Sequence, residues 1–367
     1  NINEKGEINF DYAYIGLCGI KDYKNFWNIL EKTYKENPNN SSLSDVHVIN
    51  GMMSKTDFRF VKVDKWLDIG NTSELAKTRK EFQGEYEILD KEEESIYFYD
   101  EFVVKFFSNP TINKNRVTRG INLHPLVPKI IDHSDNFYKY KKTDGQLMSK
   151  CVTVPMFLEF LEWAEANLWH SKSEDKFNER CEAFYLDKTK SRVEKYLGGK
   201  EDKTCTINCV EVDPVASLID QIDKDWLCAG TPVQFHGDFI LDNVLKTPDG
   251  FCLLDWRQDF GGNLETGDIY YDLAKLNHNL TVNHGIVESG YYGACINNCY
   301  ILCNTTLSEC QKRLHEFIVE KGYDLQKVKI LTSLIWINMS PLHEYPFSKF
   351  LFNFGKYTLH QSINEGQ

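Results

Sequence analysis

Two stretches of sequence decide the fold: Phe235–Asn243, which reads FHGDFILDN, and Phe251–Trp256, which reads FCLLDW. Asp238 precedes Asn243 by five residues, and Asp255 follows after a predicted hairpin with a Pro-Asp-Gly turn. An aspartate, an asparagine and a second aspartate in this order are the groups that metal-assisted phosphoryl transfer needs. The spacing lets Asp238 face a substrate while Asn243 and Asp255 turn toward Mg²⁺, which prefers oxygen ligands.

These motifs resemble the aminoglycoside phosphotransferase and choline kinase family, in which a protein-kinase-like fold phosphorylates small molecules. The resemblance covers residues 85–367 and implies that Asp238 is the catalytic base and that Asn243 and Asp255 hold Mg²⁺ against ATP. A second acidic motif, GDIYYDLA, starts at Gly267. The family pattern implies that its Asp272 anchors the catalytic loop.

The roles of two further residues near this loop, Asp268 and His236, are interpreted as follows. Asp268 is either the N-cap of the following helix or part of the site. His236 is interpreted as a residue that orients the loop backbone rather than one that moves protons.

Upstream, the run FVVKFF at 102–107 places Lys105 between apolar neighbours on a predicted strand. The resemblance implies that Lys105 reaches the α- and β-phosphates of ATP. The turn before this region has no glycine, so backbone N–H groups near Ser95 are predicted to bind phosphate, and residues 137–142 are predicted to meet adenine. The helix predicted at 115–123 carries no acidic residue, so the usual carboxylate partner of the lysine is not visible.

The pattern of the chain predicts an α+β, two-lobed, protein-kinase-like fold. A small antiparallel lobe is expected over 83–145, with strands at 85–89, 95–99, 102–107, 127–132 and 137–141. A mainly helical lobe is expected over 146–367, with helices at 155–168, 270–280, 290–303 and 325–339.

The first 82 residues resemble the C-terminal part of a sugar nucleotidyltransferase domain. The resemblance rests on IGLCGIKDYKNFW at 15–27 and VDKWLDIGNTSELAKTRKEF at 63–82. An α/β remnant is predicted, with strands at 14–19 and 58–63. Asp68 lies near that family's metal-binding acid, but no nucleotide-binding loop precedes it here, so no activity is assigned to it. A small packing subdomain is the alternative interpretation.

Composition limits the classes of function. The net charge of −12 argues against sequence-independent nucleic-acid binding, and no apolar run is long enough for a membrane span. Cys295, Cys299 and Cys303 repeat every four residues, which is more typical of a buried helix face than of a metal site. Eleven scattered cysteines indicate reduced thiols and a cytoplasmic location.

The resulting expectation is an ATP- and Mg²⁺-dependent kinase that phosphorylates a hydroxyl of a sugar, polyol or amino-alcohol. The nucleotidyltransferase-like segment suggests a role in surface-glycan (capsule or lipopolysaccharide) precursor synthesis, with a fused or associated nucleotidyltransferase domain as partner. Two alternatives stay open: the fused partner domain of a bifunctional sugar or amino-alcohol nucleotidyltransferase, and a nucleotide-binding pseudokinase scaffold.

Overall fold

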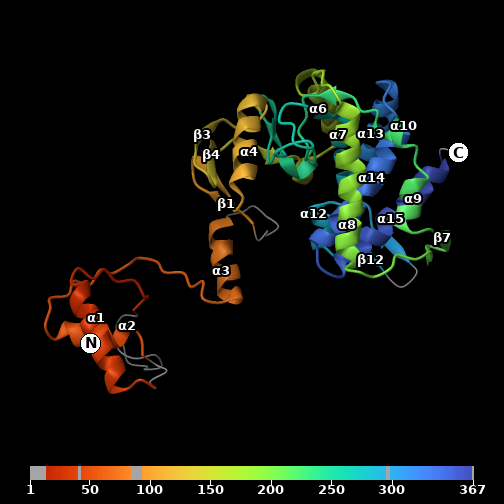
Figure 1. Cartoon of the computed structure of the whole chain (residues 1–367). Coiled ribbons are helices and arrows are strands. Elements are labelled where there is room, and N and C mark those ends of the chain that lie inside the picture. Colours follow the sequence, from red (N-terminus) through yellow and green to blue (C-terminus); the bar gives the residue numbers. More distant parts are fainter. Residues whose placement is uncertain (1–13, 40–42, 84–92, 295–297, 366–367) are drawn as a thin grey trace. The chain divides into compact units, whose positions relative to one another are not determined.

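The chain forms two compact units, Asn1–Gly84 and Glu85–Gln367. The computed structural model describes residues 14–39, 43–83, 93–294 and 298–365 (Figure 1). In that part of the chain, no helix has the length and apolar character that crossing a membrane requires. The strand predicted at 85–89 lies outside the described residues.

The described residues of the first unit form helices and no strands. The strands predicted at 14–19 and 58–63 are wrong, because both segments run without a partner strand to complete their backbone hydrogen bonds. Asp22 caps the first helix by accepting a hydrogen bond from the N–H of Asn25. The helices are α1 (Tyr23–Glu36), α2 (Asp45–Met53) and α3 (Thr72–Gln83).

The second unit begins with a small antiparallel sheet in the order β1-β2-β4-β3. Its strands alternate between the two faces, so Val103, Lys105 and Phe107 of β2 are buried while their neighbours are partly exposed. Lys105 pairs with Tyr138 of β4 in the register of the sheet. The strands are β1 (Glu94–Phe98), β2 (Phe102–Phe107), β3 (Ile130–His133) and β4 (Phe137–Lys141).

One helix, α4 (Pro110–Leu123), lies beside this sheet (Figure 1). Asn109 caps it and Pro110 occupies its first turn, where a missing N–H does no harm. The helix also contacts the start of the other lobe: a Cβ on Gly120 would lie 2.4 Å from Cζ2 of Trp256. Glycine at 120 therefore allows Trp256 to approach the helix, and Nε1 of Trp256 donates a 2.7 Å hydrogen bond to the carbonyl of Arg116.

The predicted catalytic hairpin forms a second sheet, in the order β10-β9-β5. β9 (Val244–Thr247) and β10 (Gly250–Leu253) pair in antiparallel register around a turn at residues 248–249. β5 (Gln146–Leu147) adds to β9 from the start of the helical lobe. The hairpin is thus held at the junction of the two lobes.

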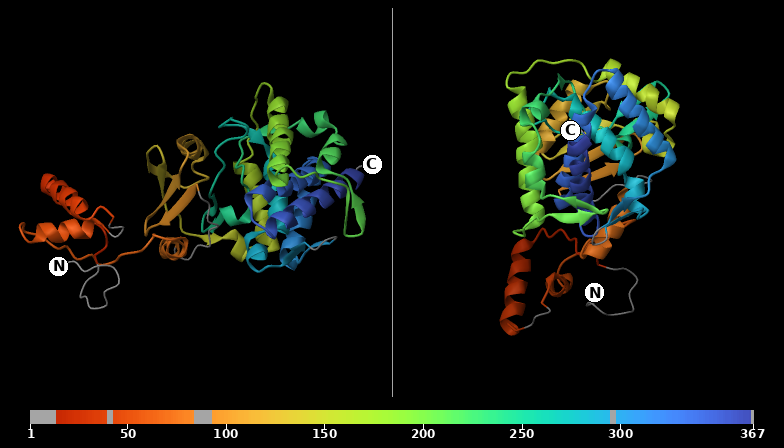
Figure 2. Two further views of the ribbon diagram at one scale, coloured as in Figure 1. Left: turned by 60° about the horizontal axis from the view of Figure 1, so that its bottom comes forward. Right: turned by 90° about the vertical axis from the view of Figure 1, so that its right-hand side faces the viewer.

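The remaining chain is mainly helical and can be followed in two further views (Figure 2). One stretch, η1 (Ala183–Asp187), is π-helical, with the N–H of Lys188 bonded to the carbonyl of Ala183. The helices are α5 (Met148–Cys151), α6 (Val154–Asn167), α7 (Phe177–Glu182), α8 (Lys188–Leu197), α9 (Val215–Asp220), α10 (Lys224–Cys228), η2 (Leu241–Asn243), α11 (Ile269–Thr281), α12 (His284–Glu288), α13 (Thr305–Glu320), α14 (Leu325–Met339), η3 (Ser340–Leu342) and α15 (Phe347–Glu365). The short strands are β6 (Cys205–Ile207), β7 (Val210–Val212), β8 (Pro232–Val233), β11 (Gly267–Asp268), β12 (Tyr292–Ala294) and β13 (Cys299–Ile301).

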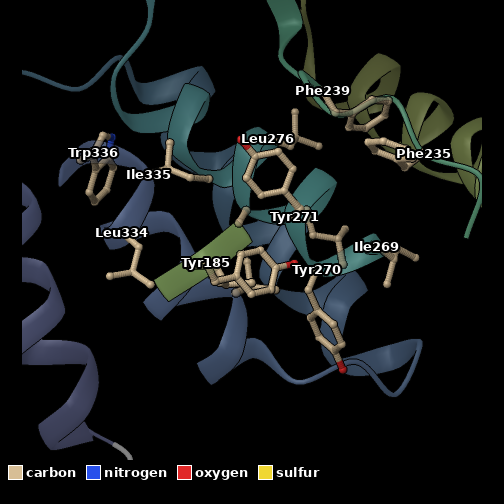
Figure 3. Close-up of a cluster of buried hydrophobic side chains, with 14 of the residues drawn as sticks. Tyr185, Phe235, Phe239, Ile269, Tyr270, Tyr271, Leu276, Leu334, Ile335 and Trp336 are labelled. Atoms are coloured by element: carbon tan, nitrogen blue, oxygen red, sulfur yellow. The ribbon is translucent and has the colours of Figure 1, made fainter. Parts of the chain in front are cut away.

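Helix α11 lies at the centre of the helical lobe. All of its residues except Lys275 are buried. Figure 3 shows Tyr271 of α11 close to Tyr185 of η1, with Leu334 of α14 nearby. Burying this many apolar side chains supplies the main driving force for folding of the lobe. Lys275 is the residue of α11 that is not fully buried.

One predicted helix is wrong. Residues 290–303 contain the hairpin strands β12 and β13 instead, with 295–297 outside the described residues. Tyr300 pairs opposite Gly293, and a Cβ on Gly293 would lie 2.5 Å from its ring. Hence Cys299 and Cys303 do not share a helix face, as the predicted helix required.

Candidate active site

Asp272, which is fully buried in α11, anchors the start of the predicted catalytic loop, residues 236–243. Its carboxylate accepts hydrogen bonds from the backbone N–H of Gly237 at 2.6 Å and of His236 at 2.8 Å. Nε1 of Trp169 donates a third bond at 3.2 Å. Burial raises the pKa of Asp272 to about 6, although these hydrogen bonds act in the opposite direction. These contacts are the ones that the predicted anchoring role requires.

His236 connects the predicted catalytic loop to the residue that follows β10. Its ring lies 2.9 Å from the carbonyl of Leu254 through Nε2, and Nδ1 accepts the N–H of Asp238 at 3.3 Å. Burial lowers the pKa of His236 to about 4, so the ring is neutral at pH 7. Both ring nitrogens are thus engaged by backbone groups, and the backbone-orienting role of His236 stays a prediction.

Asp238 follows a glycine whose backbone has a φ of +87°, a conformation that L side chains rarely adopt. Its Oδ1 lies 2.7 Å from Nζ of Lys275, and its Oδ2 accepts a 3.1 Å hydrogen bond from Asn243. Burial alone would raise the pKa of Asp238, but the Lys275 ammonium holds that pKa well below its usual range. Asp238 is therefore an anion with a fixed orientation and a partly exposed side chain.

Asp255 brings the two lobes together at the end of β10. Its Oδ1 lies 2.6 Å from Nζ of Lys105 and 2.5 Å from Nη1 of Arg116. Its backbone has a φ of +52°, which costs energy in a residue other than glycine and is seen most often at functional sites. The carboxylate partner of Lys105 that the sequence did not reveal is Asp255 itself, from the other lobe.

Asn243 and Asp255 are neighbours because the N–H of Leu254 bonds to the carbonyl of Asn243 at 2.7 Å. The amide nitrogen of Asn243 is used by Asp238, which leaves its oxygen as the atom available to a metal. One amide oxygen and one carboxylate suit Mg²⁺, which keeps several waters and takes further ligands from phosphates. Within the described residues no cluster of three or more His, Cys, Asp or Glu side chains could hold a metal, so a Mg²⁺ site here would have these two protein ligands.

Two other predicted residues lie outside this group. Asp268 is fully buried and caps α11: its carboxylate accepts the N–H groups of Thr231 and Tyr270, and the hydroxyl of Tyr185 donates to it at 2.7 Å. Ser95 lies in β1 opposite Phe106, so its side chain is on the sheet face away from Lys105. A phosphate contact by its backbone stays a prediction.

Sequence reasoning missed two basic residues of the site, Arg116 and Lys275. Arg116 belongs to the basic helix that was predicted, and Lys275 follows Asp272 by three residues, one helical turn away. That spacing, in a helix otherwise apolar around it, was the signal that could have identified Lys275.

Solved structures similar to this chain include a choline/ethanolamine kinase family protein from Mesorhizobium loti (TM-score 0.45, 12% identity, covering 79% of this chain and 98% of that one). A streptomycin-ATP complex of the aminoglycoside phosphotransferase APH(2")-IIa has a TM-score of 0.42 and 14% identity, covering 82% and 97%. Ethanolamine kinase from Plasmodium vivax has a TM-score of 0.42 and 12% identity, covering 88% and 95%. No model of a protein family and no curated protein matches the chain.

The predicted α+β organisation, a small antiparallel lobe followed by a mainly helical lobe, is confirmed. The similar structures are of the same kinds of protein that the motifs resemble. In the kinase-like unit, the antiparallel lobe carries Lys105 and Arg116, and the hairpin and α11 carry the acidic groups. The resemblance of residues 1–82 to a nucleotidyltransferase stays a prediction.

Proposed function

We propose that the chain is an ATP-dependent phosphotransferase that acts on a hydroxyl group of a small molecule. The observation that supports this most is the convergence of Asp238, Asn243 and Asp255, which flank the β9–β10 hairpin, with Lys105 from the opposite lobe. Nδ2 of Asn243 lies 3.1 Å from Oδ2 of Asp238, and Nζ of Lys105 lies 2.6 Å from Oδ1 of Asp255. These are the group types that phosphoryl transfer uses for positioning and charge stabilisation.

In the proposed reaction the acceptor hydroxyl oxygen attacks the γ-phosphorus of ATP. The bond between that phosphorus and the β–γ bridging oxygen breaks, and ADP leaves with the electron pair. Asp238 orients the hydroxyl and accepts its proton, while Lys275 keeps Asp238 ionised beforehand. Lys105 contacts the phosphates, and Asn243 and Asp255 would hold Mg²⁺. A bound Mg²⁺ supplies neutralisation of the phosphate charge.

The experiment compares ATP consumption by the wild-type chain with that of Asp238→Asn over a metabolite extract, with products identified by mass spectrometry. General-base catalysis typically contributes ~10²–10⁴-fold, so we expect at least a hundredfold loss of product formation. Asp249→Asn is the matched control, because Asp249 is exposed at the turn of the same hairpin. Full ATP-dependent phosphorylation by Asp238→Asn would refute the proposal.

The finer assignment concerns the acceptor and the pathway. We propose a sugar, polyol or amino-alcohol of surface-glycan precursor synthesis, supported by the nucleotidyltransferase-like sequence of residues 1–82 alone. A phosphorylated product that a nucleotidyltransferase then couples to a nucleotide would fit this pathway. A product outside carbohydrate and amino-alcohol metabolism would contradict it.

A second candidate is a nucleotide-binding pseudokinase. It is favoured by one observation: a single oxygen of Asp255 contacts both Lys105 and Arg116, so the proposed metal ligand is already neutralised. Calorimetry with Mg-ATP, combined with an ADP assay, separates the two candidates. Binding without ADP formation in any acceptor mixture would favour the pseudokinase.

A further inference from the structure

Four basic side chains of the helical lobe, Lys188, Arg192, Arg257 and Lys275, are here called the cation cluster. Arg192 follows Lys188 by four residues, one turn along α8. Nζ of Lys188 lies 4.2 Å from the centroid of the Phe184 ring, and the guanidinium carbon of Arg257 lies 4.9 Å from the same centroid. The Arg257 guanidinium also lies 6.0 Å from the Tyr271 ring. Lys188 and Arg257 thus both pack against the Phe184 ring.

The cation cluster adjoins the proposed catalytic base. Lys275 contacts Asp238 directly, at 2.7 Å. The backbone N–H of Arg257 donates to the carbonyl of His236 at 3.0 Å, and a Cβ on Gly237 would lie 2.6 Å from Cβ of Arg257. Arg257 is therefore packed against the catalytic loop one residue before Asp238.

This cluster is separate from the basic pair expected at the ATP phosphates. Lys105 and Arg116 come from the antiparallel lobe and contact Asp255. The cation cluster comes from α8, α11 and the segment after β10. A substrate held by it would meet Asp238 from the helical lobe.

The charges of the cluster are balanced only in part: Lys275 is paired with Asp238 at 2.7 Å. Among the described residues, neither Lys188 nor Arg192 forms an ion pair with a carboxylate. Nε of Arg257 donates to the backbone carbonyl of Asp259, while the Asp259 carboxylate accepts the N–H of Gly262.

The environment of Lys188 shows the effect of this imbalance. Burial lowers the pKa of Lys188 well below its ordinary value, and the nearby Arg257, Arg192 and Lys275 lower it further. Partly buried cations without counter-ions are unfavourable, and an anion placed among them relieves both desolvation and mutual repulsion.

Resting on the proposed function, we propose that the acceptor alcohol carries an anionic group, a phosphate or a carboxylate, which the cation cluster binds through Lys188, Arg192 and Arg257. Guanidinium groups match such oxyanions with two parallel hydrogen bonds. The same cations repel a positively charged amino-alcohol or aminoglycoside, so the proposed acceptor range narrows to sugars or polyols that carry an anionic group. The net charge of −12 would by itself suggest a cationic acceptor, whereas the cation cluster indicates an anionic one.

The test uses matched acceptors that differ in charge: glycerol with glycerol 3-phosphate, glucose with gluconate, and choline and kanamycin as cations. ADP release by the full chain is measured with Mg-ATP. We expect kcat/KM for an anionic member to exceed that of its neutral partner by at least tenfold. The phosphate and carboxylate pairs then show which oxyanion is preferred. A preference for the neutral or cationic acceptors would overturn the proposal.

Variants link the preference to the cluster. In Lys188→Met and Arg192→Gln, the ratio of kcat/KM for the anionic to the neutral acceptor should fall about tenfold, which corresponds to about 1.4 kcal/mol. Lys190→Met is the matched control, since Lys190 lies on the exposed side of the same helix. An unchanged ratio in both cluster variants would overturn the proposal.

A binding measurement separates this proposal from the proposed function. Calorimetric titration of the full chain with glycerol 3-phosphate and with gluconate needs no turnover. Binding that weakens about tenfold in Lys188→Met but not in Lys190→Met supports the anion site, even if no acceptor is phosphorylated and the proposed function fails. No binding of either anion by the wild-type chain would overturn the anion site.

Discussion

Replacing Asp272 by asparagine should change both the stability of the chain and its dependence on pH. The buried carboxylate accepts three hydrogen bonds, from Gly237, His236 and Trp169. An asparagine keeps one oxygen acceptor, and its amide nitrogen then faces a buried N–H donor. Leaving such a donor unpaired costs about 1–3 kcal/mol, so we expect Asp272→Asn to lower the free energy of unfolding by that amount at pH 7.5.

The pH dependence follows from the raised pKa of Asp272. This pKa is about 6 in the folded chain, against an ordinary value of 3.8. Between these values the folded state holds a proton that the unfolded state has released, so stability falls as pH rises through this window. The difference of about two pKa units corresponds to about 3 kcal/mol. Wild type should lose that contribution from pH 4 to pH 7.5, and Asp272→Asn should not.

Urea unfolding at pH 4 and pH 7.5 measures both effects. The destabilisation by Asp272→Asn is expected to be about 3 kcal/mol larger at pH 4 than at pH 7.5, because only the wild type gains stability in acid. Asp249→Asn, in the exposed turn of the hairpin, controls for the loss of one carboxylate. Equal destabilisation at the two pH values would refute the reasoning.

Two further substitutions test packing and charge burial. Gly120→Ala places a Cβ 2.4 Å from the Trp256 ring, so thermal unfolding should show a loss of about 1–3 kcal/mol in the free energy of unfolding. Gly19→Ala, whose Cβ would have nothing within 4 Å, is the control and should change little, and an unchanged stability of Gly120→Ala would contradict the close approach. Lys356→Met removes the partner of Asp202, whose Oδ1 lies 2.7 Å from Nζ of a Lys356 side chain that is only 1% exposed, so urea unfolding should show a loss of about 3–5 kcal/mol. Lys190→Met, at an exposed position, is the control, and a loss below about 1 kcal/mol in Lys356→Met would show that the pair is replaceable.

The sequence was most informative where local pattern and tertiary packing agree. The helix predicted at 325–339 and the strand at 137–141 have the predicted bounds, because their apolar residues repeat with the period of the element that buries them. The hairpin at 292–301 was missed because a four-residue spacing of cysteines imitates a helix, whereas Tyr300 requires the bare backbone of Gly293.

The candidate site was predictable only in part. The order Asp238, Asn243 and Asp255 lies within one hairpin, so sequence spacing reports it directly. Arg116 lies 139 residues from Asp255 along the chain, and Lys275 reaches Asp238 from a separate helix. Such contacts depend on how the lobes and helices pack, and no local pattern encodes them.

The π-helical stretch η1 determines which faces of α8, the helix that follows it directly, point toward the protein. Its wider turn contains one residue more than an α-helix needs, and Lys188 and Arg192 follow directly on α8. If residues 183–187 were wound as an ordinary α-helix, this extra residue would rotate α8 by about 100°, since an α-helix has about 3.6 residues per turn. The cations would then leave their positions without any charge being removed. The winding of one helical turn is thus what directs Lys188 and Arg192 toward the cation cluster.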